Sequence, residues 1–347
     1  MLSNFTVIGR SLCVVHNQTC LGVRSVFTTF SAPVWNGKSH VWTAVLQKKD
    51  ADDAYQEKTP IVLVHGFGGG LAMWCKNFDA LAANRTTYAI DLLGFGRSGR
   101  PTFSVDPTMA ELEWVRSLEQ WRKEMKLDKM ILLGHSLGGY LCSSYALEFP
   151  EAVRHVILVD PWGFPLKPPE TERHFNYNVP LWVKSLAHFL SLFNPLWTLR
   201  AAGPWGPTLI RRVRPDLGRK FFSDPVKQQS LFDYVYHCNA LPPSGEVAFS
   251  TISVPFGWAK RPMISRIEKI REDIPLTFIY GSRSWVDCGP GYTTKYQLRP
   301  YSYVRVEIIR GAGHHVYADQ SEAFNDLINE ICDDVDKGLD VEEVKVY

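Results

Sequence analysis

Short runs of apolar residues alternate with amphipathic stretches along most of the chain. Apolar runs of about four to eight residues, bounded by polar or glycine-rich segments, are typical of buried strands. The stretch 108–126 carries apolar residues at helical spacing and predicts a helix, as does 74–83. Strands that alternate with helices in this way indicate a parallel, doubly wound sheet. Buried strands are predicted at 61–64, 88–91, 130–133, 156–160, 276–281 and 303–309.

The two ends of the chain follow other patterns. Residues 1–49 contain no Asp or Glu. The leader 1–20 resembles a mitochondrial presequence, although its apolar pieces would also suit a membrane interface. Two edge strands are predicted within 21–46, near 21–29 and 40–46. The tail 336–347 is acidic, and we expect it to be solvated.

Residues 162–260 interrupt the alternation. Prolines and tryptophans are frequent here, and the pattern is too irregular to extend the sheet. The segment predicts a helical cap inserted between a first core part, 21–161, and a second core part, 261–335. Its apolar surface would suit a substrate with hydrocarbon chains, although packing alone would also explain it. Cap helices are predicted near 181–193, 196–202, 207–213 and 226–238.

A candidate nucleophile lies between the strand at 130–133 and a helix. Gly134-His-Ser-Leu-Gly138 matches G-x-S-x-G, in which glycines leave room for a sharp, strained turn that exposes the serine hydroxyl. Because the motif follows a strand and opens a helix, it predicts Ser136 as a catalytic serine. The alternative is a glycine-rich helix start that only packs closely on the sheet.

A glycine-rich loop follows the strand at 61–64. In a serine hydrolase, His65-Gly-Phe-Gly-Gly-Gly would supply one oxyanion donor from the amide of Phe67, and Leu137 would supply the other. A nucleotide-binding P-loop is the competing interpretation. The Gly-Lys-Ser/Thr that a P-loop needs is missing after these glycines.

The expected partners of Ser136 follow the last two strands. A serine, then an acid, then a histidine is the chain order of α/β-hydrolases. His314 is the predicted base, with His315 as the neighbour that could be confused with it. Asp287 is the predicted acid, and Asp160 at the end of an earlier strand is the alternative, since its carboxylate could also reach the histidine.

His314 and Asp319 also spell H-x-x-x-x-D, the motif of glycerolipid acyltransferases. In that interpretation His314 deprotonates a glycerol hydroxyl and Asp319 orients the ring. The local alternative is an Asp-x-x-Glu capping box for the last helix, formed by Asp319 and Glu322. Both chemistries can share one site, because an acyl group on Ser136 can be attacked by water or by an alcohol.

Composition narrows the classes of partner. The 347 residues carry a formal net charge of +2 and no run of interleaved basic and aromatic residues, so a nucleic-acid partner is not expected. The cysteines lack C-x-x-C spacing, which speaks against a metal site. No apolar run approaches the roughly 18 residues of a membrane-spanning helix. No cofactor is expected, and acyl-CoA would be a co-substrate only for an acyltransferase.

Several long and unusual segments make residues 21–335 resemble the type 4 and type 5 α/β-hydrolase-domain proteins. These two groups are linked to lysophospholipid hydrolysis and to triglyceride-lipase co-activation. The resemblance implies an α/β-hydrolase fold with an inserted cap, in which Asp287 and His314 complete the triad. The segments are His65-Gly-Phe-Gly-Gly-Gly, Asp91-Leu-Leu-Gly-Phe-Gly-Arg-Ser, Asp160-Pro-Trp-Gly-Phe-Pro, Ala202-Gly-Pro-Trp-Gly-Pro, Tyr236-His-Cys-Asn, Phe256-Gly-Trp-Ala and Gly313-His-His-Val-Tyr-Ala-Asp.

The two branches of this resemblance imply different functions. The co-activator branch looks like Gly-His-Asn-Leu-Gly-Gly at the turn, whereas this chain has Ser136, as in the lysophospholipase-like branch. Arg283 and Gly313, however, look like the co-activator branch. We therefore expect a serine ester hydrolase of N-acyl or ordinary phospholipids and lysophospholipids. The alternatives are co-activation of a triglyceride lipase at lipid droplets and acylation of lysophosphatidic acid.

The resemblance and the composition also suggest where the protein acts. We expect a cytoplasmic protein, peripheral on a lipid droplet or membrane surface. The acid-free N-terminus leaves a mitochondrial location open.

Overall fold

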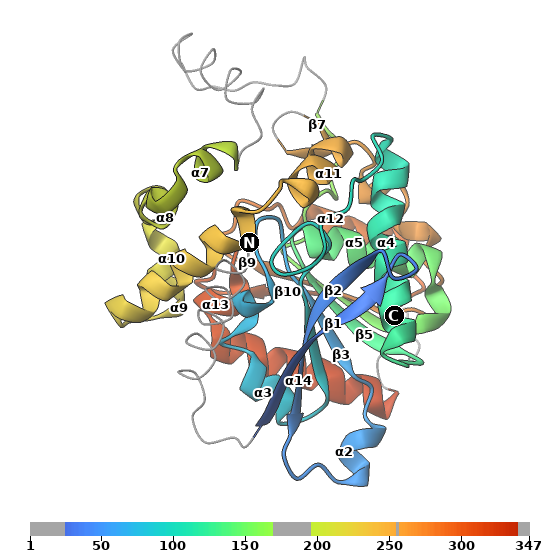
Figure 1. Ribbon diagram of the computed structural model, residues 1–347. Helices are drawn as coiled ribbons and strands as arrows, with labels where there is room; N and C mark the ends of the chain where they lie inside the picture. The colour runs from blue at the N-terminus through green and yellow to red at the C-terminus, as the bar shows by residue number, and fades with distance from the viewer. Residues whose placement is uncertain (1–24, 169–195, 255–256, 339–347) are drawn as a thin grey trace.

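The core of the protein is one eight-stranded sheet in the order β1-β2-β4-β3-β5-β6-β9-β10 (Figure 1). The computed structural model describes residues 25–168, 196–254 and 257–338. The predictions for the leader 1–20 and for a cap helix at 181–193 lie outside these residues. The strands are β1 Ser25–Val34, β2 Ser39–Lys48, β3 Ile61–Val64, β4 Thr87–Ile90, β5 Met130–His135, β6 Val153–Val159, β9 Leu276–Gly281 and β10 Val304–Ile309.

The sheet is mostly parallel, as predicted. All neighbouring pairs from β4 to β10 are parallel, while β1 and β2 form an antiparallel hairpin that pairs with β4 at one edge. β3, β5 and β9 are buried along their whole length. Strands buried on both faces read as continuous apolar runs, which is why their sequence located them correctly.

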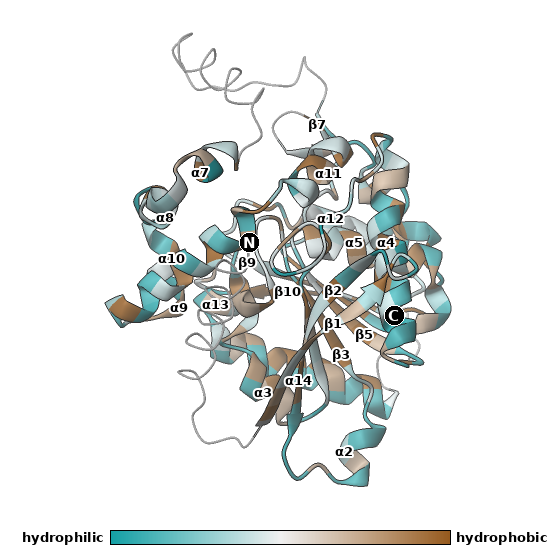
Figure 2. Ribbon diagram, viewed as in Figure 1, coloured by the Kyte–Doolittle hydropathy of each residue, from teal (hydrophilic) through white to brown (hydrophobic). Residues whose placement is uncertain are grey.

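Helices cover both faces of the sheet. Trp114 and Tyr145 belong to the apolar cluster on one face, and Trp74 and Phe324 to the cluster on the other. Figure 2 shows the apolar residues gathered on the central strands, with polar residues on the outer sides of the helices. The first face carries α4 Pro107–Glu124 and α5 Leu137–Glu148, and the second carries α3 Phe78–Ala82 and α14 Ser321–Lys337.

The continuous helix predicted at 74–83 is wrong. The segment instead forms a 3₁₀ turn, η1 Leu71–Trp74, followed by the short helix α3. The amide of Leu71 donates to the Asp91 carboxylate at 2.6 Å, and the amide of Ala72 donates to the hydroxyl of Tyr234 at 3.0 Å. These acceptors, from distant parts of the chain, satisfy the amides of the first two residues of η1. The turn therefore begins at Leu71, earlier than the helical periodicity predicts.

The cap between β6 and β9 is helical, and Figure 1 shows α7 to α10 together on one side of the core. The predictions near 196–202, 207–213 and 226–238 are confirmed, whereas α9 and α11 were not predicted. The described cap consists of α7 Trp197–Ala201, η4 Gly203–Trp205, α8 Gly206–Val213, α9 Pro215–Phe221, α10 Pro225–Asn239, α11 Ser244–Ile252 and the hairpin β7 Ser253–Val254 with β8 Trp258–Ala259.

Short elements complete the chain. Among the residues described, no helix combines the length and the apolar character needed to cross a membrane. The remaining elements are α2 Asp53–Glu57, η2 Pro150–Ala152, η5 Met263–Ser265, η6 Ile267–Lys269, α12 Gly289–Thr293, η7 Thr294–Leu298 and α13 Val316–Asp319.

Candidate active site

Ser136 occupies a strained turn between β5 and α5. Its φ of 53° and ψ of −116° are rarely adopted by residues other than glycine. The backbone is fixed on both sides: the Ser136 amide donates to Val159 O at 3.0 Å, and its carbonyl accepts from Trp162 N at 3.1 Å. A Cβ on Gly138 would lie 2.3 Å from Val64 O, so this position requires glycine. The G-x-S-x-G segment therefore forms the predicted nucleophile turn.

His314 follows β10 and contacts a carboxylate from the end of β6. Its Nδ1 lies 3.1 Å from Oδ2 of Asp160. Asp160 is fully buried, and its Oδ1 accepts a hydrogen bond from the Gly281 amide at 3.1 Å. Since the carboxylate accepts a hydrogen bond from Nδ1–H, Nε2 of His314 is left as the ring nitrogen that can take a proton.

The electrostatics of this pair suit a base. Burial, as the main cause, and the charges of Arg214 and Lys220, as the smaller causes, together lower the pKa of His314 to about 4. Burial raises the pKa of Asp160 to about 6, partly offset by hydrogen bonds from Ser284 and Gly281. At neutral pH the imidazole is therefore uncharged and the carboxylate ionised, which is the starting state that general base catalysis needs.

Asp287, the predicted acid, is not the carboxylate on His314. Asp287 is exposed, and its Oδ1 accepts the Gly289 amide at 3.0 Å just before α12. The cause lies in the backbone. Asp160 comes directly after β6, and β6 is the neighbour of β9 in the sheet. Its backbone has a φ of 43°, and in this conformation its side chain contacts His314. The alternative acid considered from the sequence is the one that the structure places there.

The two predicted oxyanion amides lie beside the serine. Leu137 is the first residue of α5, and a first helical residue has no intrahelical partner for its amide. Phe67 belongs to the glycine-rich loop after β3, which passes so close to the turn that a Cβ on Gly66 would lie 3.0 Å from Cβ of Ser136. Phe67 and Ser136 line the same cavity. The catalytic role of the two amides stays a prediction.

Sequence reasoning missed two residues that hold the site together. His135 places its Nε2 2.9 Å from the carbonyl oxygen of His314, and burial lowers its pKa to about 3, so it stays a neutral donor. Asn239, at the end of α10, donates from Nδ2 to Gly68 O at 2.7 Å. In the sequence, His135 was marked only by its position directly before Ser136, and Asn239 only by its place in the unusual segment Tyr236-His-Cys-Asn.

Asp91, directly after β4, has a supporting role near the site. Its carboxylate accepts hydrogen bonds from the backbone amides of Leu71 and Arg97, at 2.6 and 2.8 Å. It therefore shapes the two loops on either side of it, and it does not line the cavity.

Asp319 holds the loop that carries His314. Its Oδ2 accepts the Gly313 amide at 2.8 Å and pairs with Nζ of Lys220 at 3.1 Å. The predicted capping box with Glu322 is wrong: α14 begins at Ser321, and its N-cap residue Gln320 makes no side-chain capping bond. Asp319 ends α13 instead, and its carboxylate contacts the Gly313 amide and Lys220 of the cap helix α9.

Arg283 and Gly313 lie on adjacent loops. The Arg283 amide donates to Ala312 O at 2.8 Å, which joins the loop after β9 to the loop after β10. The Arg283 side chain is exposed. The two residues therefore share one side of the molecule beside His314, and their role as a co-activator face stays a prediction.

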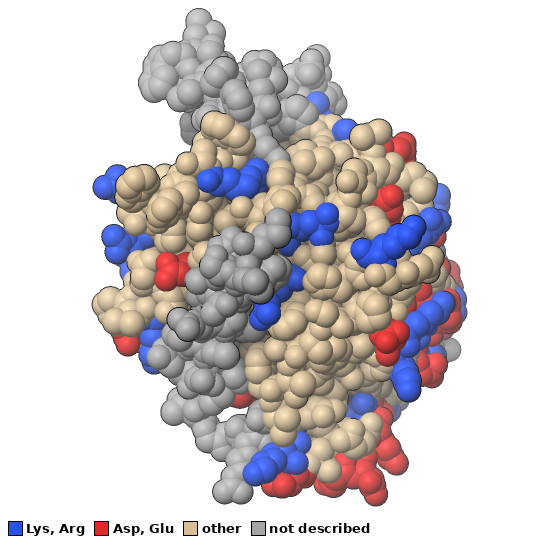
Figure 3. Space-filling model, in the orientation of Figure 1, with Lys and Arg blue, Asp and Glu red and all other residues tan. Residues whose placement is uncertain are grey.

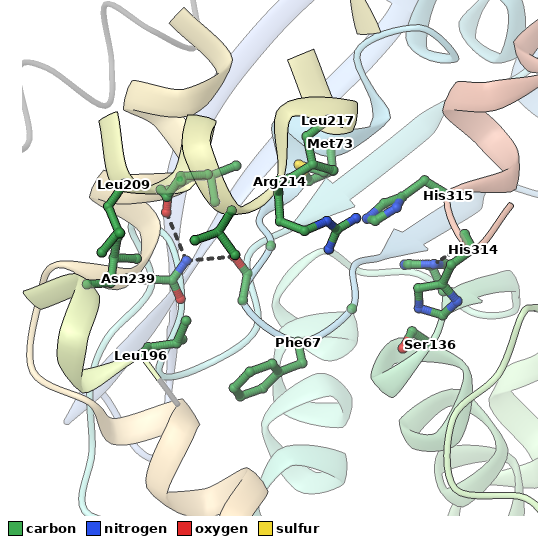
Figure 4. Close-up of a pocket in the computed structure, with 18 of the residues that line it drawn as sticks. Phe67, Met73, Ser136, Leu196, Leu209, Arg214, Leu217, Asn239, His314 and His315 are labelled. Carbon is green, nitrogen blue, oxygen red and sulfur yellow. Dashed lines mark hydrogen bonds between the residues drawn. The ribbon is translucent and has the colours of Figure 1, made fainter. Parts of the chain in front are cut away.

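A cavity of about 340 Å³ lies between the core and the cap. Figure 4 shows Ser136, His314 and His315 at one side of it and Leu196, Leu209 and Asn239 at the other. Apolar side chains of the cap form most of the distant wall, and Arg214 lies among them. The cap residues in the lining are Leu196, Thr198, Leu199, Leu209, Ile210, Val213, Arg214, Leu217, Val235 and Asn239.

Known proteins are similar to this chain in sequence, and a solved structure is similar to it in fold. The (lyso)-N-acylphosphatidylethanolamine lipase of Homo sapiens is 52% identical over 299 residues, which are 86% of this chain and 85% of that protein. The 1-acylglycerol-3-phosphate O-acyltransferase ABHD5 of Homo sapiens is 52% identical over 279 residues, 80% of this chain and 79% of that protein. The crystal structure of carboxylesterase CesB from Bacillus subtilis matches with a TM-score of 0.62 at 17% identity, covering 94% of this chain and 96% of CesB.

The match to a protein family agrees with the geometry. The alpha/beta hydrolase fold family matches residues 59–320, from the start of β3 through α13. This range contains Ser136, Asp160 and His314 together with the whole cap. The chain therefore belongs to the alpha/beta hydrolase fold family, in the group that includes the (lyso)-N-acylphosphatidylethanolamine lipases and the ABHD5 acyltransferases.

Proposed function

We propose that the protein is a serine hydrolase of lipid esters, with Ser136 as nucleophile, His314 as base and Asp160 as acid. The observation that carries the proposal is the contact of His314 with the buried Asp160, since His314 lines the same cavity as the strained Ser136. The lipase relative named above supports (lyso)-N-acyl phospholipids as the substrate class. Asp160 replaces Asp287 in this assignment.

The proposed reaction has two acyl-transfer steps. The Ser136 hydroxyl attacks the ester carbonyl while Nε2 of His314 takes its proton, and Asp160 stabilises the imidazolium that forms. The amides of Phe67 and Leu137 stabilise the negative oxygen of the tetrahedral intermediate. The imidazolium returns its proton to the departing alcohol. Water then attacks the acyl-serine, again losing its proton to His314, and releases the fatty acid.

The cap supports the choice of an acyl substrate. Leu209, Ile210 and Leu217 line the cavity, and Figure 4 shows Leu209 on the side opposite Ser136. Apolar walls with few polar groups are typical of sites that enclose hydrocarbon chains. In this arrangement the acyl chain lies against α8 and α9 and its carbonyl carbon lies at Ser136.

The nucleophile is tested with a fluorophosphonate probe, which forms an adduct only with an activated serine. We expect the wild-type chain to be labelled and the Ser136→Ala and His314→Ala variants to lose labelling. The same three proteins are then assayed with lyso-N-acylphosphatidylethanolamine. A folded Ser136→Ala variant that keeps full esterase activity would refute the proposal.

Acyl transfer to an alcohol is a second candidate activity. It is favoured by the 52% identity with the ABHD5 acyltransferase. The acyl group on Ser136 would then be attacked by a hydroxyl of lysophosphatidic acid in place of water. The test measures release of CoA from acyl-CoA with and without this acceptor. Release that does not depend on the acceptor would leave hydrolysis as the only activity.

The cap surface supports action at a lipid interface. Trp197, Trp205 and Val213 are 53%, 75% and 67% exposed along α7 to α8, next to the exposed Arg211 and Arg212. Figure 3 shows basic side chains separated by uncharged surface on this side of the molecule. Aromatic and basic residues together favour anionic membrane interfaces. Trp205→Ala should weaken co-sedimentation with anionic vesicles, whereas Tyr301→Ala, equally exposed on the core, should not.

The face formed by Arg283 and Gly313 is the proposed site for a triglyceride lipase. The support is the resemblance of these two positions to the co-activator branch, together with their position on joined loops. The test adds the protein to a purified triglyceride lipase. We expect Arg283→Ala to abolish stimulation and Ser136→Ala to preserve it. The reverse pattern would exclude this role.

A further inference from the structure

Arg214 lies at the rim of the cavity that contains Ser136 and His314. It connects α8 to α9, and it is the one Lys or Arg among the described residues that line this cavity. Figure 4 shows its guanidinium group pointing across the cavity toward His315, on the side of His314. The acyl chain and the neutral ester of a lipid substrate carry no negative charge that could pair with this cation.

Asp216 orients the guanidinium from one side. Nε of Arg214 donates to Oδ1 of Asp216, and Nη2 donates to Oδ2, each at 3.0 Å. This bidentate pair leaves the N–H groups of Nη1 for another acceptor, because a guanidinium carries five N–H donors. A ligand with several acceptor oxygens would therefore meet a donor whose direction is already set.

The charge of Arg214 acts inside the cavity despite its ion pair. After burial, it is the next largest cause that lowers the pKa of His314, and it also helps to lower the pKa of His315. Both rings face the cavity together with Ser136. An anion in this space would therefore be attracted by Arg214 while it lies close to the reacting groups.

The cation and the apolar wall are arranged as the two parts of a lysophospholipid require. In such a lipid only a few bonds separate the ester from the phosphate, so one small cavity can hold both. We propose that Arg214 binds the phosphate group of a lysophospholipid substrate, while the acyl chain lies against Leu209, Ile210 and Leu217. The proposal rests on the proposed lipid hydrolase function for the identity of the substrate.

The test measures equilibrium binding to the full chain carrying Ser136→Ala, which prevents turnover. The ligands are lysophosphatidylethanolamine and a monoacylglycerol with the same acyl chain, both below the concentration at which they form micelles, and inorganic phosphate alone. Arg214→Gln and Arg214→Lys are compared in this background. Arg219→Gln is the matched control, because it removes the same charge from an exposed residue of α9 that does not line the cavity.

Arg214→Gln should raise the Kd for lysophosphatidylethanolamine about 10-fold, the effect of losing one charge-assisted hydrogen bond. The Kd for monoacylglycerol should stay the same, and Arg214→Lys should keep part of the selectivity. Arg219→Gln should change neither Kd. The proposal would be overturned if Arg214→Gln weakened the binding of both lipids equally, or of neither. It would also be overturned if inorganic phosphate alone bound as tightly as lysophosphatidylethanolamine.

The measurement separates the two proposals. Binding is observed without catalysis, so Arg214-dependent selection of the phosphate in a protein that shows no hydrolysis with Ser136 present would refute only the hydrolase function. Hydrolysis of both lipids with no effect of Arg214 on their binding would refute only the phosphate site. Circular dichroism of each variant checks that the fold is retained.

Discussion

The side-chain amide of Asn239 donates a hydrogen bond to the carbonyl oxygen of Gly68 at 2.7 Å. Asn239 ends α10 of the cap, and Gly68 follows Phe67 in the glycine-rich loop after β3. One hydrogen bond therefore joins the cap to the loop that carries a proposed oxyanion donor. Asn239 is 5% exposed, so water does not readily replace this contact.

Asn239→Asp should lower kcat about 10-fold with little change in KM. The variant removes the donor and places a carboxylate beside a carbonyl oxygen, which displaces the loop at about 1–3 kcal/mol. Steady-state kinetics on a lysophospholipid would measure the effect. Asn329→Asp is the control, since Asn329 donates to Ala80 O at 3.3 Å outside the cavity. A similar loss in both variants would contradict a specific role of the Gly68 contact.

Asp160→Asn should reduce kcat by roughly a thousandfold to ten-thousandfold, since an amide cannot hold and stabilise the same form of His314. Asp287→Asn, the matched exposed variant, should stay close to wild type, because Asp287 bonds only to the nearby Gly289 amide among the described residues. Fluorophosphonate labelling rates and ester hydrolysis measure both. If Asp287→Asn proved to be the inactive variant, the assignment of the acid would be wrong.

The pH dependence of kcat/KM should have its acid limb at about pH 6 or below. Activity needs His314 neutral, with a pKa lowered to about 4, and Asp160 ionised, with a pKa raised to about 6. Raising the pH through this range produces the active state of both groups, so activity rises and then levels at neutral pH. An acid limb centred above pH 7 would show that His314 is protonated in the free protein.

Asp319→Asn should keep most of the hydrolase activity, whereas Asp319→Ala should lose stability. The asparagine side-chain oxygen can still accept a hydrogen bond from the Gly313 amide. Alanine leaves that amide without its acceptor and removes the nearer of the two carboxylates that pair with Lys220, at about 2–4 kcal/mol. Thermal melting and ester hydrolysis measure the two effects. A loss in Asp319→Asn as large as that in Asp160→Asn would instead support a chemical role for the H-x-x-x-x-D motif.

The sequence located most of the sheet because its strands are buried on both faces. Such strands carry continuous apolar runs, and Ile61–Val64 and Leu276–Gly281 match their predicted bounds. The turn at Ser136 was also predictable, since only glycine fits at Gly138. α9 and α11 were missed although the shorter α7 was predicted. Each contains a glycine within the helix, Gly218 and Gly245, which weakens the helical signal of the sequence.

The acid could not be chosen from chain order alone. Asp160 and Asp287 both follow strands of the parallel sheet, so both satisfied the expected order. The choice depends on the φ of 43° at Asp160 and on the Gly281 amide that holds its carboxylate. The early start of η1 has a similar origin, because Asp91 and Tyr234 supply its acceptors from distant parts of the chain.

The ion pair between Lys220 and Asp319 has a consequence for how inherited variants of this protein would be interpreted. Lys220 belongs to the cap helix α9, yet its partner also holds the amide next to His314. A variant that removes Lys220 would therefore act on the loop of the base from a helix that contains none of the proposed catalytic residues. A search for functional variants restricted to the residues around Ser136 would overlook such a substitution, although it weakens the support of the loop that carries His314.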